Sequence, residues 1–216
     1  MTSTDKKKDT LAILAHIASD IVSPMLVPSY AMVAAMCLTP LRLLPSAPKI
    51  WATIGVAFIT AIIPMTFILV LIRLGKVSDT SISNPRERTV PFCAAILCYI
   101  GAAFFVRFLH APYWIQNFYL AAAMVSAISL LVNQWWKISA HTGAVGGLAA
   151  IIFWLVQKGL VVQAPLLWLS VAFLLVGIVA WARLYLYKHT LLQTFAGALL
   201  GFSIELLFLN ITPHII

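Results

Sequence analysis

The chain has 216 residues, of which 62% are hydrophobic and only 9% are charged, and its net charge is +8. Soluble domains carry about 25% charged residues, so this composition excludes a water-soluble globular protein. The cations lie in short polar gaps between apolar runs, which favours membrane-flanking charges or anion ligands over a nucleic-acid surface. We therefore expect an integral membrane protein that binds no nucleic acid.

Seven apolar runs are long enough to be considered as membrane spans, since a helix needs about 20 apolar residues to cross a bilayer. Their continuous apolar character favours helices over the alternating pattern of a β-barrel. The runs cover roughly residues 11–38, 50–74, 91–110, 114–135, 140–158, 164–185 and 188–210. The sequence predicts an all-α, polytopic transmembrane bundle of six to seven spans, with a polar basic tail at 1–10 and one bundle domain at 11–216.

The polar gaps are predicted to share one face of the membrane. Two crossings separate the loop at 75–90 from the loop at 136–141, and two more lead to residues 183–189. An even number of crossings returns the chain to the same side. The shared face would then collect Arg73, Lys76, Arg86, Arg88, Lys137, Ser139, His141, Arg183, Lys188 and His189.

Cations and two histidines on one face suit an anion, most simply a phosphate. Arginine binds phosphate oxygens through two parallel hydrogen bonds. Histidine can act as nucleophile or general acid near neutral pH.

The spacing of these residues resembles a known family. Residues 182–193 read Ala-Arg, five residues, His, three residues, Gln, and resemble the third motif of the type 2 phosphatidic acid phosphatase family, Ser-Arg-x5-His-x3-Asp. Residues 138–141, Ile-Ser-Ala-His, are similar to its second motif, Pro-Ser-Gly-His. The loop at 76–91 stands where the first motif, Lys-x6-Arg-Pro, is expected. The resemblance implies a membrane phosphatase that requires no metal or other cofactor.

Carried over by position, the resemblance implies a role for each matching residue. His189 would attack the phosphorus, and His141 would protonate the leaving alcohol. Arg183 and Ser139 would hold the phosphate oxygens. Further cationic contacts would come from Arg88, as the arginine of the first motif, and then from Lys76, Arg86 and Lys137.

The sequence departs from the family pattern at Gln193, where the family has an aspartate. Residues 189 and 193 are one helical turn apart, so their side chains can touch. Gln193 can accept the His189 N–H through its carbonyl oxygen, but it supplies no negative charge. The first motif is also irregular, because Ser83 stands where its arginine is expected and Thr89 follows Arg88 in place of proline.

These features support two main hypotheses. The first is an integral membrane phosphatase that hydrolyses a lipid phosphate or polyprenyl diphosphate through a phosphohistidine, in a bacterial inner membrane. The alternative is a catalytically impaired relative that binds phospholipid headgroups or assists another membrane protein. The basic loops favour a cytosolic site under the positive-inside rule, whereas the resemblance implies a periplasmic or exterior one, and the sequence leaves both open.

Glu205 lies deep in the last run, where an ionisable residue is costly and needs a partner. His16 and Asp20 form a similar polar pair in the first run. We expect a structural polar contact between these two spans. A small transporter that uses Asp20 and Glu205 is a third, weaker hypothesis.

Overall fold

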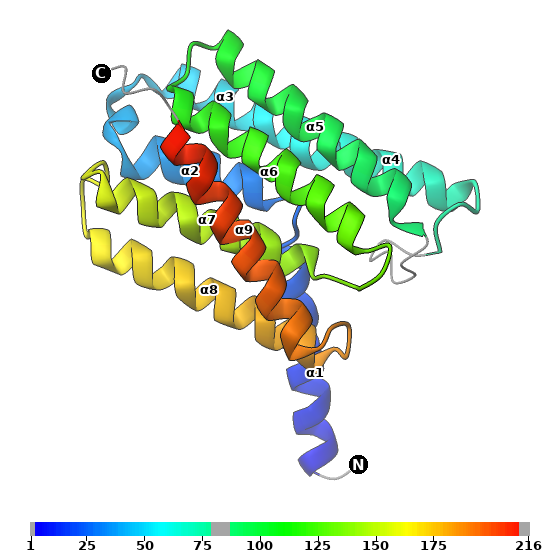
Figure 1. Ribbon diagram of the computed structural model, residues 1–216. Coiled ribbons are helices and arrows are strands. Elements are labelled where there is room, and N and C mark those ends of the chain that lie inside the picture. Colours follow the sequence, from blue (N-terminus) through cyan, green and yellow to red (C-terminus); the bar gives the residue numbers. More distant parts are fainter. Residues whose placement is uncertain (1–2, 79–86, 212–216) are drawn as a thin grey trace.

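The computed structural model describes residues 3–78 and 87–211, with side chains from Thr10 onward. Within these ranges the chain is helical and contains no strand (Figure 1). The elements in chain order are α1 (Ser3–Ile21), α2 (Val27–Leu38), the 3-10 turn η1 (Pro40–Leu43), α3 (Ser46–Ala57), the π-helical segment η2 (Phe58–Ile62), α4 (Ile63–Arg73), α5 (Thr89–Phe108), α6 (Tyr113–Val132), α7 (Ala140–Gln157), α8 (Pro165–Tyr185) and α9 (Leu191–Ile211).

Six helices of the described chain are long and apolar enough to cross a membrane. One is the continuous unit Ser46–Arg73, formed by α3, η2 and α4, and the others are α5, α6, α7, α8 and α9. Many of their large apolar side chains are exposed, as lipid-facing side chains of a membrane bundle are. The predicted all-α transmembrane bundle is therefore confirmed.

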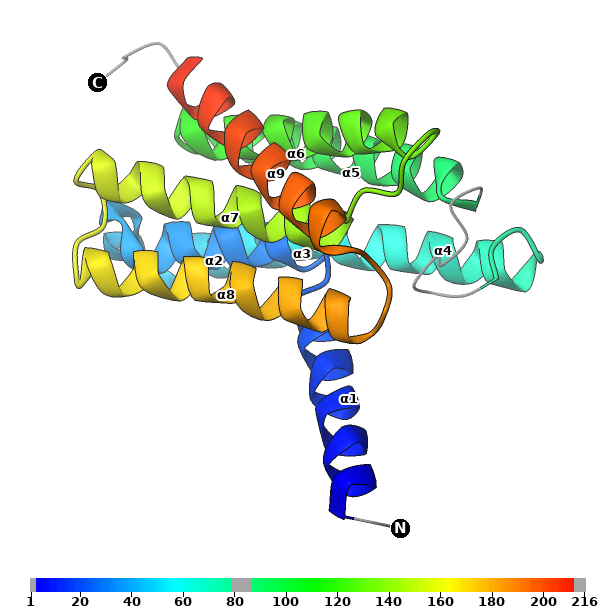
Figure 2. The same cartoon turned by 60° about the horizontal axis from the view of Figure 1, so that its bottom comes forward.

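The prediction of one continuous first span at 11–38 is wrong. The run divides into α1 and α2, which are separated by a non-helical connection around Pro24. Proline has no N–H to donate and its ring clashes with the preceding turn, so a helix breaks there. Figure 2 shows α1 leaving the bundle crosswise, while α2 packs against α3 and α7.

The connections that carry the motifs lie at one end of the bundle, as the count of crossings predicts. Figure 1 shows the end of α4, the start of α5, and the α6–α7 and α8–α9 connections at this end, which we call the site end. The inner part of α1 reaches the same end, where it packs against α8. Side chains from four separate parts of the sequence can therefore meet there.

Glycines bring α7 and α9 into close contact. A Cβ on Gly197 would lie 2.5 Å from both the Ser139 carbonyl oxygen and Thr142 Oγ1, and one on Gly201 would overlap the Gly143 carbonyl. Small residues allow helix backbones to approach in this way inside membranes. As a consequence, the start of α7 touches the start of α9, where the Ser139 N–H donates to the Gln193 carbonyl oxygen at 3.4 Å.

Candidate active site

The second motif begins α7. Ser139 is the N-cap of this helix, and its Oγ accepts a hydrogen bond from the Thr142 N–H at 3.4 Å. Serine favours this position because its oxygen satisfies an N–H that has no partner within the helix. The cap places His141 in the first helical turn, where the helix dipole favours an anion.

The third motif begins α9 through a reciprocal pair of hydrogen bonds. The Gln193 N–H donates to Thr190 Oγ1 at 3.4 Å, and the Thr190 N–H donates to Gln193 Oε1 at 3.2 Å. This arrangement is a capping box, in which a Thr and a Gln three residues later satisfy each other's backbone N–H. Gln193 is therefore part of the start of α9 as well as a neighbour of His189.

The same Gln193 oxygen fixes the tautomer of His189. Oε1 lies 3.1 Å from His189 Nδ1. Because the Thr190 N–H already identifies this atom as the amide oxygen, it can only accept, and Nδ1 must carry the proton. A neutral His189 then has its lone pair on Nε2, the nitrogen that is free to attack.

His189 is held in its neutral form by its surroundings. Burial, the Arg183 guanidinium and the Lys137 ammonium lower the pKa of His189 from 6.5 to about 3, while the hydrogen bond that His189 donates to Gln193 Oε1 acts in the opposite direction. Burial and nearby positive charge both disfavour an imidazolium. At neutral pH the side chain is therefore an uncharged base.

Arg183 and His189 are brought together by the turn that follows α8. The backbone N–H groups of Lys188 and His189 both donate to the Arg183 carbonyl oxygen, at 3.1 and 3.3 Å. Tyr187 adopts the left-handed region, with φ 52°, so that the chain can fold back. The spacing of five residues between Arg183 and His189 thus closes one compact turn.

Ser19 of α1 connects the two motif helices. Its Oγ accepts a hydrogen bond from Arg183 Nη1 at 2.7 Å, and its backbone carbonyl accepts one from the His141 ring. Ser19 is 2% exposed and Arg183 is 5% exposed. The sequence analysis did not predict a role for Ser19, because no local motif indicates a contact with residues so distant in the chain.

Arg88, the N-cap of α5, is tied to the connection that leads to the second motif. Its Nη1 donates to Asn133 Oδ1 at 3.4 Å, and the same oxygen accepts from the Ile138 N–H at 3.3 Å. Asn133 therefore links the candidate arginine of the first motif to the residue before Ser139. No local sequence motif indicates this role of Asn133.

The structure places the two predicted lysines, Lys137 and Lys76, in different surroundings. Lys137 is half-buried, and burial together with Arg88, Arg183 and Lys188 lowers its pKa. Neither lysine lines the cavity described below, but Lys137 acts electrostatically on His189, whereas Lys76 is exposed after α4 and does not. Arg86 lies outside the described residues.

The predicted polar contact between Glu205 and the first run is not found. Glu205 Oε1 has no hydrogen-bond partner among the described residues. His16 and Asp20 are exposed, and the charge of Asp20 acts on Arg183. Asp20 and Glu205 therefore lie in different parts of the structure and do not contact each other.

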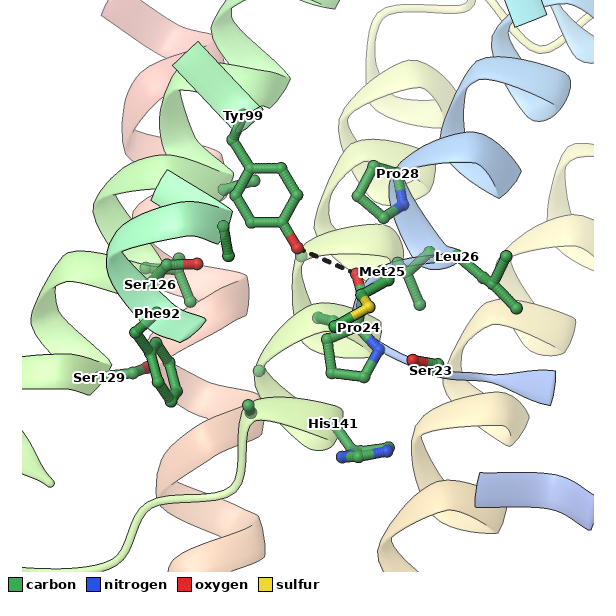
Figure 3. A pocket seen from close by; sticks show the side chains of 18 of the residues that line it. Ser23, Pro24, Met25, Leu26, Pro28, Phe92, Tyr99, Ser126, Ser129 and His141 are labelled. Atoms are coloured by element: carbon green, nitrogen blue, oxygen red, sulfur yellow. Dashed lines mark hydrogen bonds between the residues drawn. The ribbon is translucent and has the colours of Figure 1, made fainter. Parts of the chain in front are cut away.

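A cavity of about 550 Å³ joins the candidate residues. Arg88, His141, Arg183 and His189 all line it, and Figure 3 shows His141 near Ser23 and Pro24, which lie in the connection between α1 and α2. Ser139 is buried behind them and supports the start of α7. The arrangement combines a neutral imidazole, a second imidazole and two guanidinium groups around one space that can hold an anion.

A comparison with protein families finds a match for the segment that contains the second and third motifs. The family model of the PAP2 superfamily matches residues 132–215. The match covers the C-terminal part of the chain, 84 of its 216 residues. The matched segment contains the second and third motifs, whereas Arg88 and Lys76 precede it. No curated protein and no solved structure matches the chain.

The match to the PAP2 superfamily agrees with the resemblance found in the sequence. This family suggests a phosphatase that acts on phosphate esters, and the six apolar helices of the described chain suggest that the protein is integral to a membrane. Together these two observations suggest lipid-type substrates in a bilayer.

Proposed function

We propose that this protein removes phosphate from a lipid phosphate or polyprenyl diphosphate through a phosphohistidine on His189. The observation that carries the proposal is the single cavity lined by both imidazoles and both guanidinium groups. Phosphoryl transfer depends mainly on positioning and on stabilising charge at the equatorial oxygens. Arg183 and Arg88 supply that charge beside the nitrogen that attacks.

In the first step, His189 Nε2 forms a bond to phosphorus as the ester P–O bond breaks. The oxygen of the leaving group, an alcohol or a polyprenyl phosphate, takes a proton from His141, which is protonated once the phosphate dianion lies beside it and whose ring also donates to the Ser19 carbonyl. Gln193 Oε1 accepts the Nδ1–H of His189 and keeps Nε2 directed at the phosphate. The electron pair of the broken bond stays on the oxygen of the leaving group.

In the second step, water attacks the phosphorus and the P–N bond breaks. Neutral His141 takes a proton from the water, so each histidine returns to its starting state. Inorganic phosphate leaves and His189 recovers its lone pair on Nε2. Splitting the hydrolysis in this way replaces one difficult step with two easier ones.

The cationic side chains act on the phosphate throughout. Lys137, Arg88 and Arg183 repel one another electrostatically, and a bound dianion would relieve that repulsion. The dipole of α7 adds positive potential at the same place. The site end is therefore prepared for a phosphate headgroup whose hydrocarbon part remains among apolar helices.

A second candidate function is headgroup binding without efficient turnover. It is favoured by Gln193, which holds His189 but offers no negative charge to the imidazolium-like transition state. In serine proteases, loss of the corresponding charge lowers turnover about 10⁴-fold. The chain would then bind phosphorylated lipids more effectively than it hydrolyses them.

The test is phosphate release by the purified protein in detergent micelles, with phosphatidic acid and a polyprenyl diphosphate as substrates. We expect release by the wild type and at least about 10³-fold less by His189→Ala and Arg183→Ala. Ser170→Ala, on the exposed surface of α8, is the matched control. Alkaline quenching during turnover should also trap radiolabelled phosphate on His189.

Equal release by the wild type, His189→Ala and Arg183→Ala would refute the phosphatase proposal. Tight binding of phosphatidic acid without release, lost in Arg183→Ala, would establish the second candidate instead.

A further inference from the structure

The cavity extends far beyond the phosphate-binding residues into the bundle. From the site end it passes between α5 and the 22–26 connection that leads into α2, and it reaches Phe118 of α6 and Glu205 of α9. Figure 3 shows Phe92 and Tyr99 on one side and Pro24 and Pro28 on the other. Its volume is within the range of about 300–1,000 Å³ that ligand pockets occupy.

The middle of the cavity is apolar and communicates with the lipid-facing surface. Its walls there include Phe92, Ala95, Ala122 and Leu26. Ile62 and Met65, which also line it, are 54% and 39% exposed on the outside of the bundle. A hydrocarbon chain can therefore enter sideways from the bilayer, beside η2 and α4.

The deep end of the cavity is polar. Glu205 lines it and is 1% exposed, and its Oε1 has no hydrogen-bond partner within the part of the chain that the structure describes. Gln193 and Glu205 are twelve residues apart on α9, a distance of about 18 Å along a helix axis. An unpaired polar oxygen at this depth needs a water molecule or another polar partner.

We infer that this cavity binds one hydrocarbon chain of the phosphorylated lipid and that Glu205 sets how long the chain can be. The inference rests on the proposed function for the position of the phosphate. Charge complementarity defines the occupant, because cations surround one end and apolar walls follow. A molecule with a phosphate head and a hydrocarbon tail matches both parts.

Glu205 limits chain length through desolvation. A chain that stops short of Glu205 leaves its carboxyl group hydrated, whereas a longer chain would displace the water and leave Oε1 unsatisfied against a methyl group. Such burial of a polar group without a partner is unfavourable. Up to that point, each buried methylene strengthens binding about fourfold.

The experiment measures KM and binding for a series of single-chain alkyl phosphates of increasing length, with the wild type, Glu205→Leu and Glu205→Gln. For the wild type, KM should fall about fourfold per methylene and then stop falling at one chain length. Glu205→Leu should move that limit to longer chains. Glu205→Gln, which keeps a polar group of the same shape, should leave the limit in place.

Non-hydrolysable alkyl phosphonates of the same lengths separate this inference from the proposed function. Their stabilisation of the protein against thermal unfolding reports chain binding whether or not phosphate is released. A limit that moves in Glu205→Leu supports the inference even if no variant hydrolyses a phosphate ester. The same length profile in all three proteins, or no dependence on length, would overturn it.

A variant in the apolar wall provides a second measurement in case Glu205→Leu does not fold. Ala122→Phe narrows the middle of the cavity, far from the imidazoles. We expect it to weaken binding of the long phosphonates at least tenfold and to leave the shortest one unaffected. Unchanged binding of the long phosphonates by Ala122→Phe would also overturn the inference.

Discussion

Ser19 Oγ accepts a hydrogen bond from Arg183 Nη1 at 2.7 Å, although 164 residues separate the two in the sequence. The same residue offers its backbone carbonyl to the His141 ring. Helix α1, which leaves the bundle crosswise, thus orients both the candidate phosphate-binding arginine and the candidate general acid. The segment that supplies Ser19 lies outside the matched PAP2 segment.

The first prediction concerns this hydrogen bond. Ser19→Ala removes the side-chain acceptor of Arg183 but retains the carbonyl that His141 uses. A hydrogen bond to a charged group is worth about 1.5–3 kcal/mol, so we expect kcat/KM for a lipid phosphate to fall about tenfold or more. The loss should appear mainly in KM, because Arg183 binds the phosphate in both ground and transition states.

Two variants control this experiment. Ser19→Thr restores a hydroxyl and should recover most of the activity. Ser170→Ala, at an exposed serine of α8, should resemble the wild type. If Ser19→Ala has the same KM as Ser170→Ala, then Ser19 does not position Arg183 for binding.

The second prediction concerns Gln193, whose side chain is both a capping group and a partner of His189. Gln193→Glu has the same shape and can keep both contacts while adding a negative charge. The charge should stabilise the imidazolium-like transition state, so we expect kcat to rise at least about tenfold, within a ceiling of about 10⁴. Steady-state hydrolysis of the same lipid phosphate measures it.

The shorter Gln193→Asp variant is the contrast. It adds the family carboxylate but shortens the side chain that reaches the Thr190 N–H, so we expect a smaller gain with some loss of thermal stability. A rate for Gln193→Glu at or below that of the wild type would show that charge at this position does not limit catalysis.

The third prediction concerns pH. Since burial and neighbouring cations lower the pKa of His189 to about 3, the ring is neutral above that value and becomes protonated only below it. Nitrogen NMR of labelled histidine should therefore show His189 uncharged from pH 5 to 8. In Gln193→Glu the added carboxylate favours the imidazolium and should raise this pKa. Titration of wild-type His189 near pH 6.5 would contradict the structure's electrostatics.

Much of this fold follows directly from composition and spacing. Long apolar runs with few charges leave only membrane helices, and the gap predicted between the runs at 164–185 and 188–210 coincides with the break between α8 and α9. The Arg-x5-His spacing correctly predicts that Arg183 and His189 lie close together, because both residues belong to one short turn. Local patterns are readable when the residues that make them are close in sequence.

The remaining features depend on contacts that no local pattern encodes. The break at Pro24 separates α1 from α2 inside a run that is apolar throughout. The roles of Ser19 and Asn133 arise only when distant helices pack. By contrast, the capping box between Thr190 and Gln193 carried a readable signal, a Thr followed three residues later by a Gln before an apolar run.

The fourth prediction concerns the close contact between α7 and α9. In Gly201→Ala the added methyl would overlap the Gly143 carbonyl, which is backbone and cannot move aside without separating the helices. We expect destabilisation of about 1–3 kcal/mol or more, together with loss of phosphate release. Thermal unfolding in detergent, followed by intrinsic fluorescence, measures the first effect.

Gly177→Ala is the matched control, because a Cβ at Gly177 of α8 meets no atom within 4 Å among the described residues. Alanine also favours the helix over glycine by about 1 kcal/mol, so this variant should be as stable as the wild type or more stable. Equal behaviour of Gly201→Ala and Gly177→Ala would show that the two motif helices do not need their glycine contact.

The fifth prediction separates two lysines that the sequence alone could not distinguish. Lys137 is half-buried among the cations of the site end, and its lowered pKa reflects burial and the nearby Arg88, Arg183 and Lys188. A bound phosphate supplies the missing negative charge. Lys137→Ala should therefore weaken phosphate binding about tenfold, whereas Lys76→Ala, at an exposed position away from the cavity, should leave KM unchanged. Inhibition of lipid phosphate hydrolysis by inorganic phosphate gives the inhibition constant of each variant, and the same assay without inhibitor gives its KM.

If Lys76→Ala raised the inhibition constant and Lys137→Ala did not, the first-motif lysine of the family pattern would have to reach the site by a rearrangement of the α4–α5 connection. The charge cluster around Lys137 would then be a structural feature of the α6–α7 connection.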